Sequence, residues 1–178
     1  MNWKPLTNTL ATTLLLGSVA PLVAHATVFM SVQQAQQAMF PAATMQKVAV
    51  QLSDDQVKQL KKATGIYHAF KGDQVYQVAG GGWFVVDQVL GKHEMITYAI
   101  GLNPDGSVKQ VEVLEYRETY GGDVRNASWL GQFKGKTVTD TLKLNKDIKN
   151  ISGATLSSRH LTDGIKRVLL IRQMVRVA

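Results

Sequence analysis

The chain has 178 residues, a formal net charge of +7 and no cysteine. Without cysteine it cannot form disulfides, thiolate metal sites, a c-type haem attachment or a lipid-modified N-terminal cysteine. The length fits one domain with a core of its own, and the positive charge suits an anionic cofactor, an acidic redox partner or lipid headgroups. Nucleic acid is a poor partner, because no cluster of basic residues is interleaved with aromatic ones. Any redox role therefore needs a cofactor that is not held through sulfur.

Residues 1–26 have the pattern of a secretory signal peptide. A single basic residue, Lys4, precedes an apolar stretch at 10–20, and Ala24-His25-Ala26 is a small-x-small cleavage motif. The apolar stretch is short for a membrane-spanning helix, although an uncleaved anchor is the alternative. We therefore expect a periplasmic or otherwise extracytoplasmic protein, with membrane association left open.

Residues 27–52 are expected to form an N-terminal arm ahead of the main domain. The segment is rich in Gln and Ala, and residues 31–40 (SVQQAQQAMF) predict a short helix that ends at or just before Pro41.

The main domain is predicted to span residues 53–178 and to begin with a second helix. Ser53 and Gln56 have the spacing of a capping box, and Gly65 is a glycine stop. No chemistry is evident in this helix, so we expect its polar face to be solvated.

Alternating β-branched and aromatic residues then predict an antiparallel meander. Glycine-rich or polar turns separate its strands, and the run Gly80–Gly82 is read as a turn or bulge because the Gly-Lys-Ser/Thr of a phosphate loop is missing. Helical spacing returns after residue 158. The predicted fold class is α+β, an antiparallel sheet with an N-terminal helix and a C-terminal helix packed on one face. The predicted strands lie at 75–79, 83–89, 93–102 and 108–116.

The segment Ser152–Ser158, SGATLSS, carries four hydroxyls on a turn of small residues just before the C-terminal helix. Thr155 or Ser157 is predicted to be the N-cap of that helix. Unpaired N–H groups and the helix dipole make a helix start suitable for a phosphate. The alternative is that Thr155 only caps a packed helix.

The run ISGATLSS resembles the flavinylation motif of the FMN-binding domain family, which includes the C subunit of the sodium-pumping NADH:quinone oxidoreductase and the G subunit of the Rnf complex. The likeness extends over about 65–174, through VLEYRETYGGDV and WLGQFKGK. It implies that Thr155 is joined to FMN by a phosphodiester, which a flavin transferase using FAD installs outside the cytoplasm.

The resemblance also implies a set of cofactor-binding residues around that threonine. No catalytic residue and no metal ligand is expected. The bend Glu118-Thr119-Tyr120-Gly121 stands where the family more often has ETPG; Glu118 as a surface carboxylate and Trp129 as a core residue are the alternative reading. The residues implied for the phosphate and ribityl part are Ser152, Gly153, Ala154, Thr155, Leu156, Ser157 and Ser158, and those for the ring or ribityl part are Glu118, Thr119 and Gly121.

Lys149 stands where the family usually has Asp, three residues before Ser152. If this segment is extended, Asp147 lies on the same side and its carboxylate could serve instead. Alternatively, Lys149 binds the anionic phosphodiester and helps to retain FMN. A third reading leaves Lys149 as a solvated side chain near the helix start.

Together these features predict an extracytoplasmic electron-transfer flavoprotein, more a carrier or redox subunit than a stand-alone enzyme, that works with a membrane-associated donor or acceptor. The alternatives are a secreted, flavin-free binding module and a flavin reductase that binds FMN reversibly. Hydrolysis is not expected, because Ser157, His160 and Asp163 lie within two turns of one helix and no nucleophile elbow is present.

Overall fold

The computed structural model describes residues 27–175. The predicted signal peptide, residues 1–26, lies outside the described part, as do the last three residues. Residues 27–175 form a six-stranded antiparallel sheet of order β1-β6-β5-β4-β3-β2. The strands are β1 (Thr27–Val28), β2 (Met45–Val48), β3 (Val75–Val78), β4 (Trp83–Leu90), β5 (Met95–Leu102) and β6 (Val108–Tyr116).

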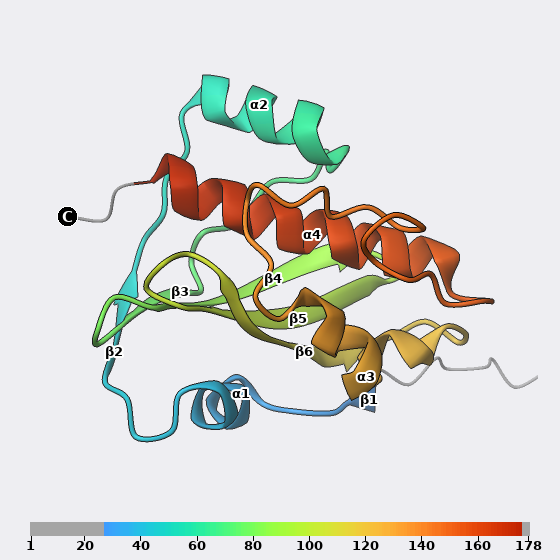
Figure 1. Ribbon diagram of the computed structural model, residues 1–178, viewed down its shortest axis with the longest axis horizontal. Coiled ribbons are helices and arrows are strands. Elements are labelled where there is room, and N and C mark those ends of the chain that lie inside the picture. Colours follow the sequence, from blue (N-terminus) through green and yellow to red (C-terminus); the bar gives the residue numbers. More distant parts are fainter. Residues whose placement is uncertain (1–26, 176–178) are drawn as a thin grey trace, which may run out of the picture.

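Helices cover both faces of this sheet (Figure 1). Helix α4 (Thr155–Met174) packs on one face, and α2 (Asp54–Thr64) packs over α4 on the same side. Helix α1 (Val32–Met39) covers the opposite face. The predicted α+β class, with the C-terminal helix packed on one face, is confirmed.

The two covered faces give two apolar cores. The larger core lies between the sheet and α4 and includes Trp83, Ile100 and Ile165. The smaller core joins α1 to the other face through Met39 and Phe84. Because β4 and β5 are buried on both sides, their sequences are almost continuously apolar rather than strictly alternating.

The helix signals read from the sequence are confirmed. Ser53 and Gln56 form a reciprocal capping box at the start of α2, and Gly65 ends this helix in the left-handed conformation, with φ of 69°. Ser31 and Gln34 form a second capping box at the start of α1, which ends two residues before Pro41. The glycine run after β3 is the predicted turn.

Residues 27–52, expected as an arm, contribute α1 and both outer strands of the sheet. Strand β1 pairs with β6, and β2 pairs with β3. Segment 45–48 has no clear alternation because its middle residues face solvent at the sheet edge, so its pairing depends on a distant partner.

The connection from β6 to α4 is long and mostly without regular structure. It contains a 3₁₀ turn at Gly122–Arg125, the short helix α3 (Ala127–Leu130) and a second 3₁₀ turn at Gly131–Phe133. Between residues 27 and 175, no helix is both long and apolar enough to cross a membrane.

Candidate functional site

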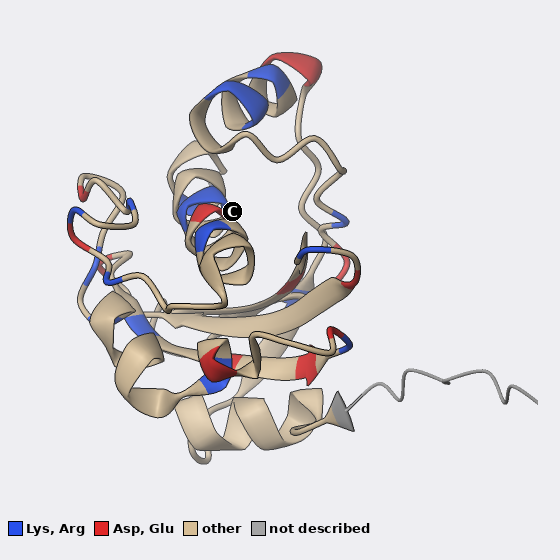
Figure 2. Ribbon diagram, turned by 90° about the vertical axis from the view of Figure 1, so that its right-hand side faces the viewer, with Lys and Arg blue, Asp and Glu red and all other residues tan. Residues whose placement is uncertain are grey.

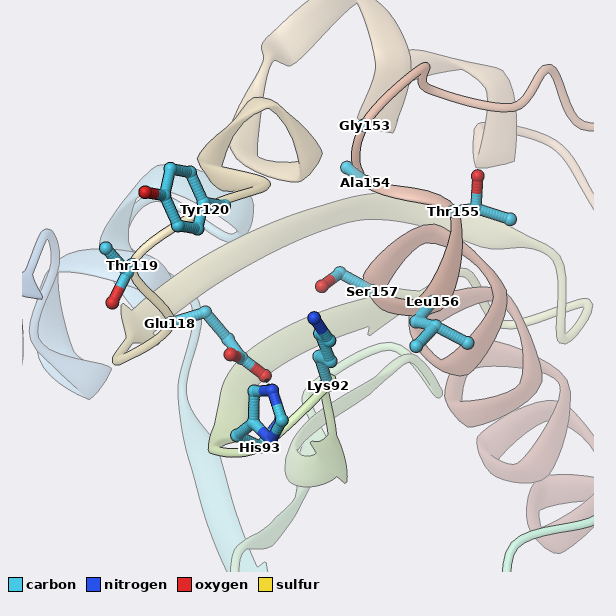
Figure 3. A pocket seen from close by; sticks show the side chains of 10 residues that line it. All are labelled: Lys92, His93, Glu118, Thr119, Tyr120, Gly153, Ala154, Thr155, Leu156 and Ser157. Atoms are coloured by element: carbon cyan, nitrogen blue, oxygen red, sulfur yellow. Dashed lines mark hydrogen bonds between the residues drawn. The ribbon is translucent and has the colours of Figure 1, made fainter.

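A cavity of about 530 Å³ lies at the N-terminal end of α4. Three segments form it: the β4–β5 turn, the chain after β6, and the start of α4 (Figure 3). Its volume is in the range, roughly 300–1,000 Å³, of pockets that bind small molecules and cofactors. Its lining residues are Lys92, His93, Glu118, Thr119, Tyr120, Gly153, Ala154, Thr155, Leu156 and Ser157.

The start of α4 leaves backbone N–H groups without partners. Ala154 is the N-cap residue and makes no side-chain cap, so the prediction that Thr155 or Ser157 caps this helix is wrong. Gly153, with φ of 81°, turns the chain into the helix. Among the residues described, no atom accepts a hydrogen bond from the backbone N–H groups of residues 155–157, which form the first turn of the helix.

The Thr155 hydroxyl is engaged outside its own helix. Its Oγ1 accepts a hydrogen bond of 3.0 Å from Nδ2 of Asn150, and the Asn150 Oδ1 is buried with no partner among the residues described. Thr155 is half-buried and lines the cavity. Thr155 therefore lies at the edge of the cavity, and its hydroxyl has a fixed neighbour and no capping role.

Glu118 joins two walls of the cavity. Its carboxylate accepts hydrogen bonds from the backbone N–H groups of His93 and Glu94 in the β4–β5 turn. Partial desolvation raises the pKa of Glu118, but these backbone N–H bonds outweigh it, so the net shift lowers the pKa. Glu118 thus remains ionised and holds the β4–β5 turn against the chain that follows β6.

Tyr116 is a site residue that the sequence did not reveal. Its hydroxyl donates to the Tyr120 carbonyl at 2.6 Å and lies 3.2 Å from the Ser157 hydroxyl. Desolvation is the main cause that raises the pKa of Tyr116, with the charges of Glu118 and Asp123 adding to it and the Ser157 bond opposing it. In the sequence, Tyr116 read only as the last apolar residue of a strand.

Lys92 and His93 were also missed, because the sequence indicated a turn at Lys92 and the start of a strand at His93. Both are exposed and line the cavity. Figure 3 shows the Lys92 side chain extending from the turn toward Ser157. The Gly-Lys pair at 91–92 was visible, but no spacing marked the lysine as facing the helix start.

The structure brings most of the sequence-predicted site residues to one place and leaves others apart. Gly121 lies just behind the wall, where an added Cβ would approach the Tyr116 hydroxyl and Ala154. Ser152 is exposed on the turn, and Ser158 is fully buried with no partner for its hydroxyl among the described residues. Those lining the cavity are Glu118, Thr119, Gly153, Ala154, Thr155, Leu156 and Ser157.

Lys149 is exposed and does not line the cavity. Its backbone is fixed instead, because its N–H bonds Gln132 Oε1 at 2.8 Å and its carbonyl accepts from Trp129 Nε1 at 2.7 Å. Residues 145–147 form a turn, so the extended geometry considered for Asp147 is wrong. The Asp147 carboxylate binds backbone N–H groups at 142 and 143.

His160 has a structural contact rather than a catalytic one. Its Nδ1 lies 3.0 Å from the Gly91 carbonyl and also contacts the Leu90 carbonyl, and since a carbonyl only accepts, Nδ1 is the donor. The Ser157 hydroxyl faces Tyr116. In the described part of the chain, no group of His, Asp and Glu side chains is placed to hold a metal ion.

This chemistry fits a cofactor with an anionic end and a flat ring. The helix start offers unpaired N–H groups for a phosphate, and Tyr120 and Leu156 give apolar surface beside the opening. Lys92 lines the cavity from the β4–β5 turn. Fold and site together define an α+β domain with a cavity of a size and chemistry that suit such a cofactor.

The model of the FMN-binding domain family matches residues 91–170, which include every residue that lines the cavity. The chain is also similar to the G subunit of the proton-translocating ferredoxin:NAD(+) oxidoreductase complex of Clostridium ljungdahlii, with 26% identity over 132 residues, 67% of this chain and 71% of that protein. The resemblance indicated by the SGAT motif is thus confirmed: the chain carries an FMN-binding domain, and FMN is its cofactor.

Proposed function

We propose that this protein is an extracytoplasmic electron-transfer flavoprotein, with FMN joined to Thr155 through a phosphodiester. One observation carries the proposal: Thr155 lies at the edge of the cavity, at a helix start, and its hydroxyl does not serve as a cap. The reading in which this threonine is only a helix cap loses its basis, since the helix has no side-chain cap at all.

The start of α4 supplies what a phosphodiester needs. Its first N–H groups and the positive end of the helix dipole stabilise a negative charge at the N-terminus. Gly153 is exposed, so an incoming group meets no bulky side chain at that position. Asn150 restrains the threonine oxygen through its 3.0 Å hydrogen bond.

The rest of the cavity suits the flavin ring. Glu118 and Tyr116 hold the walls together from behind, and Leu156 and Tyr120 offer apolar surface at the opening. When bound, FMN supplies the reversible electron transfer, while the protein positions the ring and sets its electrostatic surroundings.

The attachment itself is assigned to a flavin transferase that uses FAD. The Thr155 oxygen forms a bond to the phosphorus on the FMN side of FAD, the pyrophosphate bond breaks, AMP leaves and the hydroxyl proton is released. The exposure of Ser152 and Gly153 supports access by such an enzyme.

The redox partners are proposed to be membrane-associated. Support comes from the similarity to a subunit of a proton-translocating ferredoxin:NAD(+) oxidoreductase complex. The protein is then a redox subunit or carrier between a donor and an acceptor in such a complex, outside the cytoplasm.

Coexpression with a flavin transferase, followed by intact-mass measurement after denaturation, tests the attachment. We expect the wild type to gain the mass of one FMN less one water, Thr155→Ala to remain at polypeptide mass, and Thr155→Ser to be flavinylated because it keeps the hydroxyl. Ser157→Ala is the matched control and should still carry FMN, since the Ser157 hydroxyl faces Tyr116. Covalent FMN on the denatured Thr155→Ala variant would disprove the assignment.

A further inference from the structure

We infer that Lys92 tunes the reduction potential of the bound flavin, by facing the negative charge that the ring gains on reduction. The inference rests on FMN occupying the cavity at the start of α4, as the proposed function requires. Lys92 would act on the ring and not on the phosphate.

Lys92 is the one Lys or Arg among the residues that line the cavity. Within residues 27–175, its ammonium group forms no ion pair and no hydrogen bond. Figure 3 shows its Nζ directed from the β4–β5 turn toward Ser157 across the cavity. The ammonium is therefore an uncompensated cation facing the space that the cofactor occupies.

The neighbouring carboxylate does not pair with this cation. Glu118 binds the backbone N–H groups of His93 and Glu94, the two residues that follow Lys92. Because Glu118 fixes this backbone, the turn presents the Lys92 side chain from a constrained position.

The phosphate belongs to a different part of the site. In Figure 3 the Thr155 hydroxyl points away from Lys92, and its oxygen contacts Asn150. The proposed function puts the phosphate on that oxygen, at the start of α4, and the ring in the cavity that Lys92 lines. A cation beside a ring that becomes more negative stabilises the reduced form over the oxidised form.

The test measures the midpoint potential of FMN-loaded wild type and variants by anaerobic dye titration at one pH and ionic strength. For Lys92→Met we expect the preference for reduced over oxidised flavin to fall about tenfold, a decrease of about 30 mV for a two-electron couple. Lys92→Arg keeps the charge and should restore most of the wild-type value.

Lys47→Met is the matched control. Lys47 is also an exposed lysine, but it lies on edge strand β2 at the far end of the sheet from β6, so the variant loses the same charge away from the cavity (Figure 2 shows the spread of charged residues over the fold). We expect its potential to equal that of the wild type. An equal decrease in both variants would show a net-charge effect and overturn the inference.

FMN content, measured on every sample before the titration, separates the other outcomes. If Lys92→Met loads fully and keeps the wild-type potential, the inference is wrong. If Lys92→Met carries less FMN than the wild type and the loaded fraction keeps the wild-type potential, Lys92 serves to retain the cofactor. The inference is then also wrong. A wild type that takes up no FMN after transferase treatment would instead contradict the proposed function.

Discussion

Gly121 shows how a single residue shapes the wall behind the cavity. Its φ is +88°, in the left-handed region, and an added Cβ would lie 2.7 Å from the Tyr116 hydroxyl and 3.2 Å from the Ala154 Cβ. Tyr116 in turn bonds the Tyr120 carbonyl and faces Ser157. A side chain at 121 would therefore push apart two of the segments that form the site.

We expect Gly121→Ala to lower the free energy of unfolding by about 2–5 kcal/mol. The left-handed backbone costs about 1–2 kcal/mol with a Cβ present, and overpacking typically adds about 1–3 kcal/mol. Denaturant unfolding at neutral pH measures this loss, and FMN content after transferase treatment measures the damage to the site.

Gly80→Ala is the matched control for this variant. Gly80 also has a left-handed backbone, with φ of +92°, but an added Cβ there meets no atom within 4 Å. It should lose only the conformational part, about 1–2 kcal/mol, and keep its FMN. Equal losses of stability in the two variants would mean that the contact with Tyr116 does not matter.

At the scale of elements, a glycine lets α4 approach the sheet. Gly164 is buried within the helix, and a Cβ there would lie 2.5 Å from Val89 Cγ1 and 2.8 Å from the Tyr98 hydroxyl. This close packing fixes α4, and hence its N-terminal end, relative to the β4–β5 turn. The geometry of the cavity therefore depends on a residue far from it along the helix.

Gly164→Ala should destabilise the protein by up to about 2 kcal/mol, because overpacking costs about 1–3 kcal/mol and the better helix propensity of Ala recovers about 1 kcal/mol. Urea unfolding gives the difference. Gly131→Ala serves as control, since Gly131 has right-handed helical dihedrals and open space around it, and should be neutral or slightly stabilising. A stabilised Gly164→Ala would show that α4 does not pack as closely as described.

The sequence predicts those helices and strands whose formation depends on residues close together in the chain. The short helix before Pro41, the capping box at Ser53 and the strands of the central meander follow from patterns within a few residues. The outer strands β1 and β2 were not foreseen, because each is a short edge strand whose pairing depends on a distant segment.

The candidate site likewise has features that a local sequence pattern predicts and features that depend on distant segments. The SGAT turn was readable, and the structure brings it to the cavity together with Glu118. The N-cap prediction failed because the Thr155 hydroxyl contacts Asn150 rather than its own helix. Lys92 and Tyr116 gave no local signal, since their roles arise only when the β4–β5 turn and α4 meet.

At the scale of the whole molecule, a buried ionic network joins the sheet to its covering helix. Arg167 of α4 pairs with Asp87 of β4 at 2.7 Å, and both side chains are almost fully buried. Tyr98 of β5 donates to the same Asp87 oxygen at 2.8 Å, and Arg167 also donates to the backbone carbonyls of His68 and Gln88. The network thus connects two strands, one helix and the loop before β3.

This network predicts how stability depends on alkaline pH. Burial, followed by the charge of Asp87, raises the pKa of Tyr98 well above its ordinary value of 10.0, and Arg167 offsets only part of this. Above pH 10 the unfolded chain releases this phenolic proton while the folded protein retains it. The stabilisation is therefore complete below pH 10 and is lost as the pH rises further, by up to about 1.4 kcal/mol per pH unit from this one group.

Tyr98→Phe tests the assignment. The variant should be less stable at neutral pH by about 1 kcal/mol, because the hydrogen bond to Asp87 is lost, yet its stability should fall less steeply than that of the wild type above pH 10. Urea unfolding at intervals between pH 8 and pH 11, a range chosen roughly to bracket the ordinary tyrosine pKa, measures both effects. Tyr67→Phe is the control, because Tyr67 is 78% exposed, and it should follow the wild-type curve. Parallel alkaline slopes for wild type and Tyr98→Phe would show that Tyr98 does not couple folding to pH.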